Sequence, residues 1–252
     1  MSTALITGAS AGLGTEFTKR LEKYFPDVDT VWLIARNEKK LEEAAKSLKK
    51  AKGVVIPLDL CDEESFEKLS ELLKTEKPEI ELLINNAGCG YLGNIGETSW
   101  KDQTRMVDLN ARAMTAVSEI AVPYVADGGR IINISSIASF CPSPRMTVYS
   151  ATKAFASFFS RGLGDELRPK GIKVTAVCPG PMATEFLDAA RITGRSKTFQ
   201  ILPYCDPKKV AEGALKASKA GRAVYTPRGF YKLFRFLAKI LPQSLMINFT
   251  RT

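Results

Sequence analysis

Seven short runs of apolar, often β-branched residues, separated by charged segments, constrain the fold of this chain more than any other feature of its sequence. Two of the separating segments, EKKLEEAAKSLKKA and DEESFEKLSELLKT, have the spacing of an amphipathic helix. Strands that alternate with helices form a parallel sheet with helices on both faces. We therefore predict a doubly wound α/β fold with strands at residues 3–7, 30–35, 53–58, 81–84, 130–135, 172–177 and 223–226.

No linker or low-complexity segment divides the 252 residues, so we predict one domain over residues 1–252. The N-terminus lacks the basic start and the apolar run of a signal peptide, and no apolar stretch approaches the ~18 residues that span a bilayer. The five cysteines are scattered without a C-x-x-C pair, and the chain has no histidine. This pattern argues against a zinc site and favours reduced thiols. We expect a soluble, cytoplasmic protein without a bound metal.

The net charge of +9 is concentrated near the C-terminus. Residues 191–252 carry 13 Lys and Arg against two acidic residues, a balance of +11, whereas residues 1–190 sum to −2. Such a basic segment suggests contact with an anionic group: a phosphate-bearing ligand, a carboxylated substrate or a membrane surface. A solvated basic surface without a partner is an equally good interpretation.

A glycine-rich turn, TGASAGLG, follows the first predicted strand and contains Gly8, Gly12 and Gly14. Glycines at such a turn let a pyrophosphate approach the unpaired N–H groups that begin the next helix. The spacing G-x-x-x-G-x-G differs from the commoner G-x-G-x-x-G, and a flexible turn without a ligand would also need glycines. In a strand–turn–helix context, the motif favours a dinucleotide site.

The second predicted strand ends in IARN, where NAD-binding proteins usually place an acidic residue for the adenosine ribose. Here Ala35 and Arg36 occupy those positions. A guanidinium can bind the 2′-phosphate of NADP, and a carboxylate would repel it. The pair therefore favours NADP, although a surface arginine without a ligand would look the same.

Tyr149 and Lys153, in YSATK, are the candidates for proton transfer in a chain without histidine. The stretch VYSATKAFASFFSRGL has no proline, and it has an apolar stripe at Val148, Ala151, Phe155, Phe158, Phe159 and Leu163. We predict a helix there, which sets residues four apart on one face. A neighbouring ammonium favours the phenolate and so lowers the pKa of a tyrosine. Taken alone, such a pair also arises by chance.

TGASAGLG, NNAG at residues 85–88, ISS at 134–136, YSATK and PGPMAT at 179–184 occur in this order. With them the chain resembles the short-chain dehydrogenase/reductase family over about residues 3–226, and the resemblance implies a Rossmann-type sheet. It implies four catalytic residues: Asn110, Ser136, Tyr149 and Lys153. Ser136 stands 13 residues before Tyr149, as the family pattern expects, whereas Ser135 is expected to be structural.

The resemblance further implies NADP(H) as the cofactor. In the family, the asparagine that Asn110 matches holds a water beside the lysine, the acid that Asp59 matches bonds the adenine, and the threonine that Thr184 matches meets the nicotinamide carboxamide. The full set of expected cofactor-binding residues is Gly8, Ser10, Gly12, Leu13, Gly14, Arg36, Asp59, Leu60, Asn86, Ala87, Gly88, Tyr149, Lys153, Pro179, Gly180 and Thr184.

The same resemblance assigns the chemistry. Lys153 and the cationic ring of an oxidised nicotinamide would lower the pKa of Tyr149. Tyr149 would then act as acid in carbonyl reduction and as base in alcohol oxidation, while Ser136 donates a hydrogen bond to the substrate oxygen. No metal is needed for this mechanism.

Three loops are expected to set substrate specificity: residues 89–100, residues 137–146 and a loop at about 184–205. Their apolar side chains favour a lipophilic pocket, although each of them could equally pack on the body; they are Tyr91, Leu92, Phe140, Met146, Phe186, Leu187, Phe199, Ile201 and Leu202. Segment 227–252 is basic and amphipathic, with Arg228, Lys232, Arg235 and Lys239 on one side of a predicted helix. It could pack on the body or on a subunit, cover the substrate, or make peripheral contact with a membrane.

We predict an NADP(H)-dependent oxidoreductase that interconverts a lipophilic ketone and a secondary alcohol, such as a hydroxysteroid or a bile acid. Two alternatives remain: reduction of a 3-oxoacyl thioester on acyl-carrier protein or CoA, and a non-catalytic NADP-binding sensor or membrane-docking protein. The resemblance implies a homodimer or homotetramer formed through helices near residues 99–125 and 148–168. No nucleic-acid partner is expected.

Overall fold

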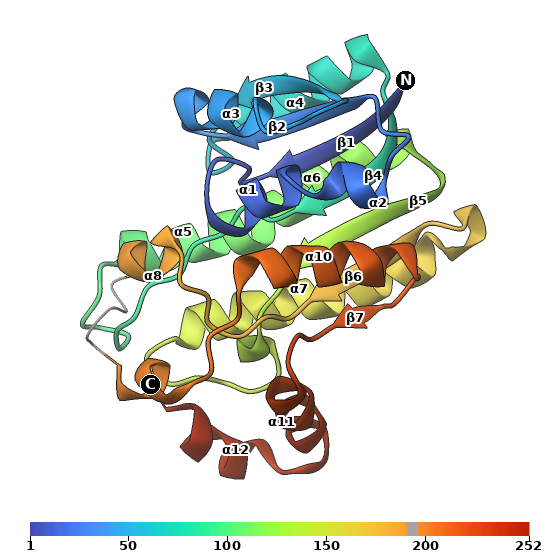
Figure 1. The fold of residues 1–252 in the computed structure, drawn as a ribbon. Helices are drawn as coiled ribbons and strands as arrows, with labels where there is room; N and C mark the ends of the chain where they lie inside the picture. Colours follow the sequence, from blue (N-terminus) through green and yellow to red (C-terminus); the bar gives the residue numbers. More distant parts are fainter. Residues whose placement is uncertain (191–195, 252) are drawn as a thin grey trace.

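The computed structural model describes residues 1–190 and 196–251. Seven parallel strands form one sheet in the order β3-β2-β1-β4-β5-β6-β7 (Figure 1). The predicted α/β fold and all of the predicted strands are confirmed. Their bounds are β1 Ser2–Thr7, β2 Thr30–Ala35, β3 Lys52–Pro57, β4 Glu79–Asn85, β5 Val125–Ile134, β6 Lys173–Val177 and β7 Val224–Tyr225.

Strand β5 begins five residues earlier than the predicted start at Arg130, because it includes the segment VADGG. Gly128 in this segment has a φ of +78°, which a side chain would disfavour. The pairing of β4 with β5 changes register between Ile80 and Leu82. An irregular start of this kind carries no apolar pattern, so the sequence indicated only the regular part of the strand.

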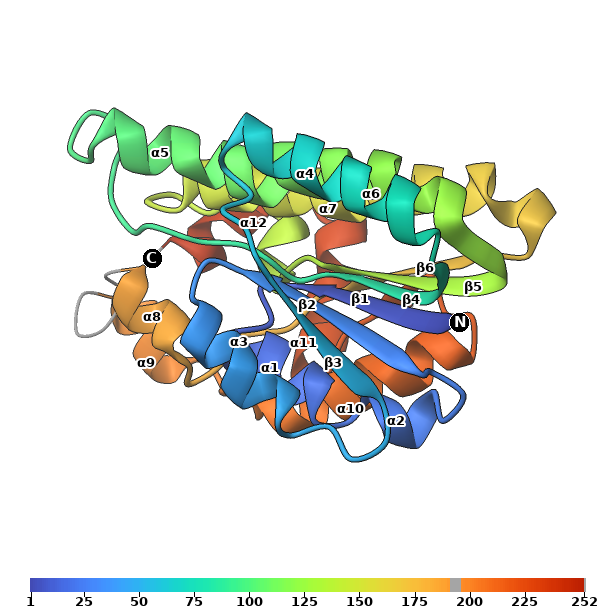
Figure 2. The same ribbon diagram turned by 90° about the horizontal axis from the view of Figure 1, so that it is seen from above.

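Helices cover both faces of the sheet (Figure 2). One face carries α4 Glu63–Glu76, α5 Trp100–Val107, α6 Ala113–Ala121 and α7 Thr147–Glu166. The other carries α1 Gly12–Thr18, α2 Leu21–Tyr24, α3 Glu38–Ala45 and α10 Pro207–Lys219. A π-helical turn, Asp108–Arg112, joins α5 to α6.

The strands supply both layers of the core because successive side chains point to opposite faces. Ile6 and Leu33 pack with α1 and α10, whereas Leu5 and Ile34 pack with α4 and α6. All four are fully buried. This two-sided burial explains why the strands read as continuous apolar runs rather than as alternating patterns.

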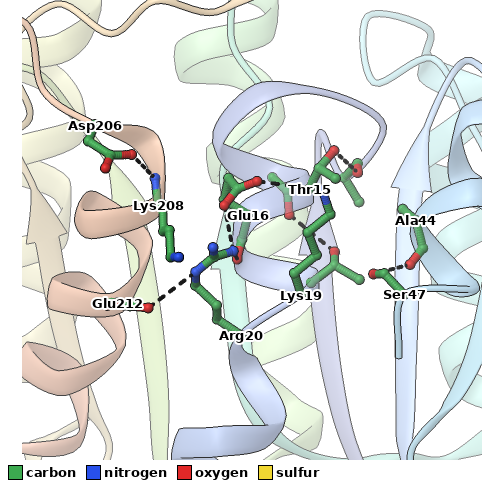
Figure 3. Close-up of polar contacts among 12 residues, drawn as sticks. Thr15, Glu16, Lys19, Arg20, Ala44, Ser47, Asp206, Lys208 and Glu212 are labelled. Atoms are coloured by element: carbon green, nitrogen blue, oxygen red, sulfur yellow. Dashed lines mark hydrogen bonds and ion pairs between the residues drawn. The ribbon is translucent and has the colours of Figure 1, made fainter. Parts of the chain in front are cut away.

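Polar contacts join α1 to α10 on the outer surface of one helical layer (Figure 3). Arg20, which lies between α1 and α2, is 2.5 Å from Glu16 of α1 and 3.4 Å from Glu212 of α10. Asp206 accepts a hydrogen bond of 2.9 Å from the Lys208 N–H and so caps the start of α10. The Arg20 ion pairs hold α10 beside α1.

Helix α7 confirms the predicted helix around Tyr149, but its apolar stripe faces outward. Phe158 is 79% exposed and Phe155 is 40% exposed. The inner face carries small or polar residues: Ser150, Thr152, Lys153, Ala156 and Ser160. Ser160 accepts a hydrogen bond of 3.0 Å from Asn133 of β5. Small side chains let α7 approach the sheet closely, which leaves the large ones outside.

The C-terminal part adds α8 Glu185–Ala189, α9 Lys197–Ile201, α11 Gly229–Ile240 and α12 Gln243–Thr250. Helices α11 and α12 lie beyond β7, at the end of the molecule opposite β3 (Figure 1). The predicted amphipathic segment is therefore two helices. Within residues 1–190 and 196–251, every helix is too short or too polar to cross a bilayer.

Candidate active site

A cleft of about 1110 Å³ opens where the strands end. β1 and β4 are neighbours at the centre of the sheet, and the chain leaves them toward opposite halves, which is where open α/β sheets bind ligands. The cleft gathers nearly all of the predicted cofactor residues: Gly8, Ser10, Gly12, Leu13, Arg36, Asp59, Leu60, Asn86, Ala87, Gly88, Tyr149, Lys153, Pro179, Gly180 and Thr184.

Gly14 is the exception in the predicted cofactor set. A Cβ atom at this position would lie 2.1 Å from the Gly8 carbonyl oxygen and 2.7 Å from Asn86 Nδ2. Gly14 is buried behind the cleft wall and is not among its lining residues. The absence of a side chain lets α1 pack against the turn, and direct contact between Gly14 and the cofactor stays a prediction.

The two loops that follow β1 and β4 are bonded to each other. Asn86 Nδ2 donates hydrogen bonds of 3.0 Å to the carbonyl oxygens of Thr7 and Gly8. The Asn86 and Ala87 N–H groups donate bonds of 3.0 Å to Thr7 Oγ1. Hydrogen bonds therefore join the two loops into one floor of the cleft.

Ser136, Tyr149 and Lys153 meet at the centre of the cleft. Ser136 follows β5 and forms a side-chain hydrogen bond with Tyr149. Lys153 Nζ lies 5.8 Å from the centre of the Tyr149 ring and donates a bond of 3.0 Å to the Ile134 carbonyl oxygen. Ser135 points away and donates a bond of 2.7 Å to the Lys153 carbonyl oxygen, which agrees with the structural role predicted for it.

Burial shifts the pKa values of both Tyr149 and Lys153. Burial raises the pKa of Tyr149 to about 12, and the hydrogen bond with Ser136 opposes the rise only in part. Burial also lowers the pKa of Lys153 to about 8. The protein's own groups therefore favour a neutral phenol, because desolvation of the phenolate outweighs the hydrogen bond with Ser136. The predicted lowering by Lys153 together with an oxidised nicotinamide stays a prediction.

Asn110 lies in the π-helical turn between α5 and α6 and is completely buried. Its Oδ1 accepts a bond of 2.8 Å from the Cys89 N–H, and its Nδ2 donates bonds of 2.8 Å to the Cys89 carbonyl oxygen and 3.0 Å to Thr152 Oγ1. The wider turn brings this side chain inward. Asn110 thus clamps the backbone after β4 against α7, one residue before Lys153.

Charged residues line the far end of the cleft, beyond β2 and β3. Arg36 is 67% exposed, with its guanidinium 3.8 Å from Asp59. Arg105 of α5 approaches the same carboxylate at 3.4 Å. Although burial opposes ionisation of Asp59, the Cys61 N–H and the two guanidinium groups hold its pKa below the usual range. This end of the cleft is therefore charged and hydrated.

The opposite end of the cleft is apolar. Of the predicted pocket residues, Tyr91, Met146, Phe186, Leu187, Phe199 and Leu202 line it. The other three do not: Leu92 is buried beneath the pocket, Phe140 packs on Phe234, and Ile201 is 82% exposed. The predicted loop at 184–205 includes residues 191–195, which lie outside the described residues. Helices α11 and α12 complete this end with Phe230, Tyr231, Leu233, Phe234, Leu237, Leu241, Met246, Phe249 and Thr250.

Three charged residues beside the cleft were not identified from the sequence. Arg105 pairs with Asp59, and Lys40 Nζ lies 2.9 and 3.0 Å from the two carboxylate oxygens of Glu185. The Lys40–Glu185 pair crosses from α3 to α8, and both residues line the cleft. The available signal for Lys40 is its position in the first turn of the helix that follows Arg36. Nothing in the sequence indicated that Glu185 would face it.

Comparisons with known proteins agree with this arrangement. The family model described as short chain dehydrogenase matches residues 2–193. An uncharacterized oxidoreductase of Staphylococcus aureus strain USA300 is 30% identical over 216 residues, which cover 85% of this chain and 89% of the relative.

Two solved structures share the fold across almost the whole chain. A short-chain dehydrogenase from Sphingobium yanoikuyae in complex with NADPH has a TM-score of 0.80 at 28% identity, and the match covers 97% of this chain and 98% of that one. The bulky-bulky ketone specific alcohol dehydrogenase from Comamonas testosteroni has a TM-score of 0.77 at 30% identity over 98% of this chain and 94% of that one. With the family motifs gathered around one cleft, the chain belongs to the short-chain dehydrogenase family and is an oxidoreductase with a Rossmann fold.

Proposed function

We propose that the protein is an NADP(H)-dependent oxidoreductase that interconverts a bulky lipophilic ketone and its secondary alcohol. One observation carries this proposal: Ser136, Tyr149 and Lys153 stand between a charged end and an apolar end of the same cleft. A dinucleotide suits the first end, and a large apolar substrate suits the second.

The cleft residues fit a nicotinamide dinucleotide. Gly8 and Gly12 have φ values of +64° and +52°, which favour glycine, and they keep the turn before α1 open. A Cβ atom at Gly88 would lie 2.9 Å from Asn110 Oδ1 and 3.3 Å from Lys153 Nζ. Without side chains there, the wall between the glycine-rich turn and Lys153 stays clear for an extended ligand.

Each part of the cofactor has candidate contacts in the cleft. The glycine-rich turn would hold the phosphates, and the loop after β4 would hold the adenosine ribose. Lys153 would bind the nicotinamide ribose, and Thr184 would meet the nicotinamide. The remaining expected contacts are Ser10 and Leu13 at the phosphates, Asp59 and Leu60 at the adenine, and Pro179 and Gly180 beside the nicotinamide.

Arg36 supports a preference for NADP over NAD. Its guanidinium is exposed at the charged end of the cleft, with Ala35 rather than a carboxylate before it. The carboxylate of Asp59 is already paired with Arg105, which leaves the positive charge of Arg36 less fully compensated. A phosphate monoester could therefore bind there by charge-assisted hydrogen bonds.

Tyr149 is the residue that transfers the proton. The nicotinamide supplies or accepts the hydride when it is bound. Tyr149 gives its hydroxyl proton to the oxygen of a ketone, and a phenol whose pKa is raised by burial holds that proton at neutral pH. Ser136 donates a hydrogen bond to the same oxygen and stabilises the negative charge that develops there. Lys153 compensates the phenolate that Tyr149 becomes.

The apolar end of the cleft supports a bulky substrate. Phe186 packs 5.9 Å from the Tyr149 ring, and aromatic or aliphatic residues of α11 extend the wall beyond it. The Comamonas testosteroni relative is described as specific for bulky-bulky ketones. Within this class we propose a hydroxysteroid or a bile acid, since the large apolar end suits a steroid ring system.

The test is to incubate the protein with a panel of substrates and to monitor turnover by the loss of NADPH absorbance. The same panel is run in parallel with NADH. The panel contains keto-steroids, keto bile acids, bulky diaryl ketones, small ketones and 3-oxoacyl thioesters. We expect turnover of bulky ketones with NADPH at rates well above those for small ketones. If only the 3-oxoacyl thioesters are turned over, the apolar end binds an acyl chain rather than a bulky ketone. If no member of the panel is turned over, the proposal is refuted.

Two further properties complete the proposal. We propose a homo-oligomer formed through the outer faces of α5, α6 and α7, where Trp100, Val107, Phe155 and Phe158 are exposed. We also propose a cytoplasmic location, since the five cysteines are all unpaired, as expected of a reducing compartment.

A further inference from the structure

We propose that α11 and α12 form a docking surface for an anionic lipid bilayer. Three large side chains of α11 point away from the body: Leu233, Phe236 and Ile240 are 57%, 58% and 60% exposed. Leu245 and Phe249 of α12 are 46% and 70% exposed. We call these five residues the docking face. Exposed apolar side chains gathered on neighbouring helices mark an interaction site rather than ordinary surface.

A basic stripe runs beside this docking face. At about 100° per residue, Lys232 and Lys239 lie within about 20° of each other and about 60° or less from Phe236. Both lysines are exposed, and the chain has no acidic residue after Glu212. A helix with an apolar stripe next to a basic one suits the boundary between acyl chains and anionic headgroups.

The inward side of α11 is already occupied, so the docking face is not needed for packing on the body. Tyr231 is fully buried and donates a hydrogen bond of 2.7 Å to the Pro203 carbonyl oxygen. Phe234 lies 6.5 Å from Phe140, and the Arg235 guanidinium lies 5.9 Å from the same ring. These contacts hold α11 on the body in one orientation, with the docking face outward.

Charge favours a bilayer over a second copy of this chain as the occupant. In a two-fold dimer the same patch meets itself, so Lys232 and Lys239 would approach the lysines of the other copy. Like charges brought together oppose such a contact, whereas an anionic bilayer attracts them. The docking face therefore suits a lipid surface better than it suits its own copy.

The active-site cleft opens at this surface. Phe230, Leu233 and Phe249 are exposed and also line the apolar end of the cleft. A lipophilic ketone dissolved in the bilayer would enter the cleft between these side chains without crossing water. This consequence rests on the proposed function, whereas docking itself does not.

Flotation with lipid vesicles tests the docking directly. We expect the full-length protein to float with vesicles of phosphatidylcholine and phosphatidylglycerol, and to float less in high salt or with phosphatidylcholine alone. Phe236→Gln/Ile240→Gln should weaken the binding at least about 10-fold, since it removes apolar area from the bilayer. Neither residue lines the cleft, so cofactor binding and turnover of a water-soluble ketone should be retained.

Two double variants with the same change in net charge show whether vesicle binding depends on the lysines beside the docking face or on the total charge of the protein. Lys232→Gln/Lys239→Gln should weaken binding to the anionic vesicles. Lys49→Gln/Lys50→Gln makes the same change in net charge between α3 and β3, at the opposite end of the molecule (Figure 1), and should bind as the wild type does. Equal effects of the two variants would overturn the docking face as the site.

Two other outcomes would also overturn the proposal. One is wild-type protein that stays unbound with the anionic vesicles. The other is a combination of two results: the wild type does not bind vesicles, and Phe236→Gln/Ile240→Gln forms a smaller oligomer than the wild type in sedimentation velocity. That combination would make the docking face a subunit interface. Because flotation needs no substrate, a failure of the proposed function would leave this result unaffected.

Discussion

Lys153 is a cation in a place that disfavours its charge. Burial lowers its pKa to about 8, from the ordinary value of 10.5. Below pH 8 the lysine is protonated in both the folded and the unfolded chain, so the folded state bears the full cost of the buried charge. As the pH rises from 8 to 10.5, the folded state releases its proton first and this cost disappears.

Lys153→Met should therefore stabilise the protein while it abolishes turnover. We expect the free energy of unfolding to rise by up to about 3 kcal/mol at neutral pH, an upper bound because the variant also removes the hydrogen bond to Ile134. The gain should shrink between pH 8 and pH 10.5. Urea unfolding across this pH range measures it, and a variant less stable than the wild type at pH 7 would show that the hydrogen bond of Lys153 outweighs its buried charge.

Arg36 should determine the choice between the two dinucleotides. Arg36→Asp replaces a donor for the 2′-phosphate with a carboxylate that repels it, so kcat/KM for NADPH should fall by about 10- to 100-fold. The value for NADH should change little or rise. Steady-state kinetics with both cofactors measures the ratio, and Lys46→Asp, elsewhere on the same side of the sheet, serves as a control for the change in charge. An unchanged ratio would exclude contact between Arg36 and the phosphate.

The site residues that belong to sequence motifs were predictable from the sequence. Ser136, Tyr149 and Lys153 meet as the motifs predicted, because the ends of β5 and the start of α7 fix them. The pKa direction of Tyr149 was not predictable, since it depends on how completely the ring is enclosed. The Lys40–Glu185 pair joins residues 145 positions apart, and a side-chain contact over that separation has no local signal.

At the scale of elements, α11 is tied to the loop that follows β6. A Cβ atom at Gly180 would lie 2.2 Å from the Tyr231 ring, and Tyr231 also bonds Pro203 at the end of the loop after Thr184. One buried tyrosine thus contacts both the loop after β6 and the loop after α9. The position of α11 is therefore coupled to the positions of these two loops.

Gly180→Ala should separate these two elements. Because the added methyl group overlaps the Tyr231 ring, we expect a loss of about 1 to 3 kcal/mol in stability and a higher KM for substrate. Gly162→Ala, on the exposed side of α7 with no atom near its Cβ, should instead stabilise by up to about 1 kcal/mol. Thermal unfolding and kinetics of both variants measure this. If the two variants behave alike, Tyr231 does not pack tightly on Gly180.

The elements that are buried on both faces were predictable from the sequence. Every strand carries an apolar run because helices cover both faces of the sheet, and these runs marked all seven. The early start of β5, the π-helical turn at Asn110 and the outward stripe of α7 were not predictable. Each depends on which neighbour an element meets in three dimensions. One domain over residues 1–252 remains a prediction.

At the scale of the whole molecule, the outer face of α7 should hold subunits together. Phe158 is 79% exposed, and the Phe155 and Phe159 rings stack at 5.6 Å beside it. Phe158→Glu places a charge in this apolar face, so we expect the dissociation constant of the oligomer to rise at least about 10-fold. Sedimentation velocity measures it. Phe249→Glu, equally apolar and exposed on α12, is the control, and dissociation by the control alone would place the interface at the other end of the molecule.

The most direct test of the whole account is turnover and cofactor binding by Tyr149→Phe, measured on a bulky ketone that the wild type reduces. The substitution removes the hydroxyl group that supplies the proton to the substrate oxygen and keeps the ring, so kcat should fall by about 10² to 10⁴-fold. The dissociation constant for NADPH, followed by its fluorescence, should stay within a factor of about two to three. Substantial turnover by the variant would contradict Tyr149 as the acid and base, and with it the proposed chemistry.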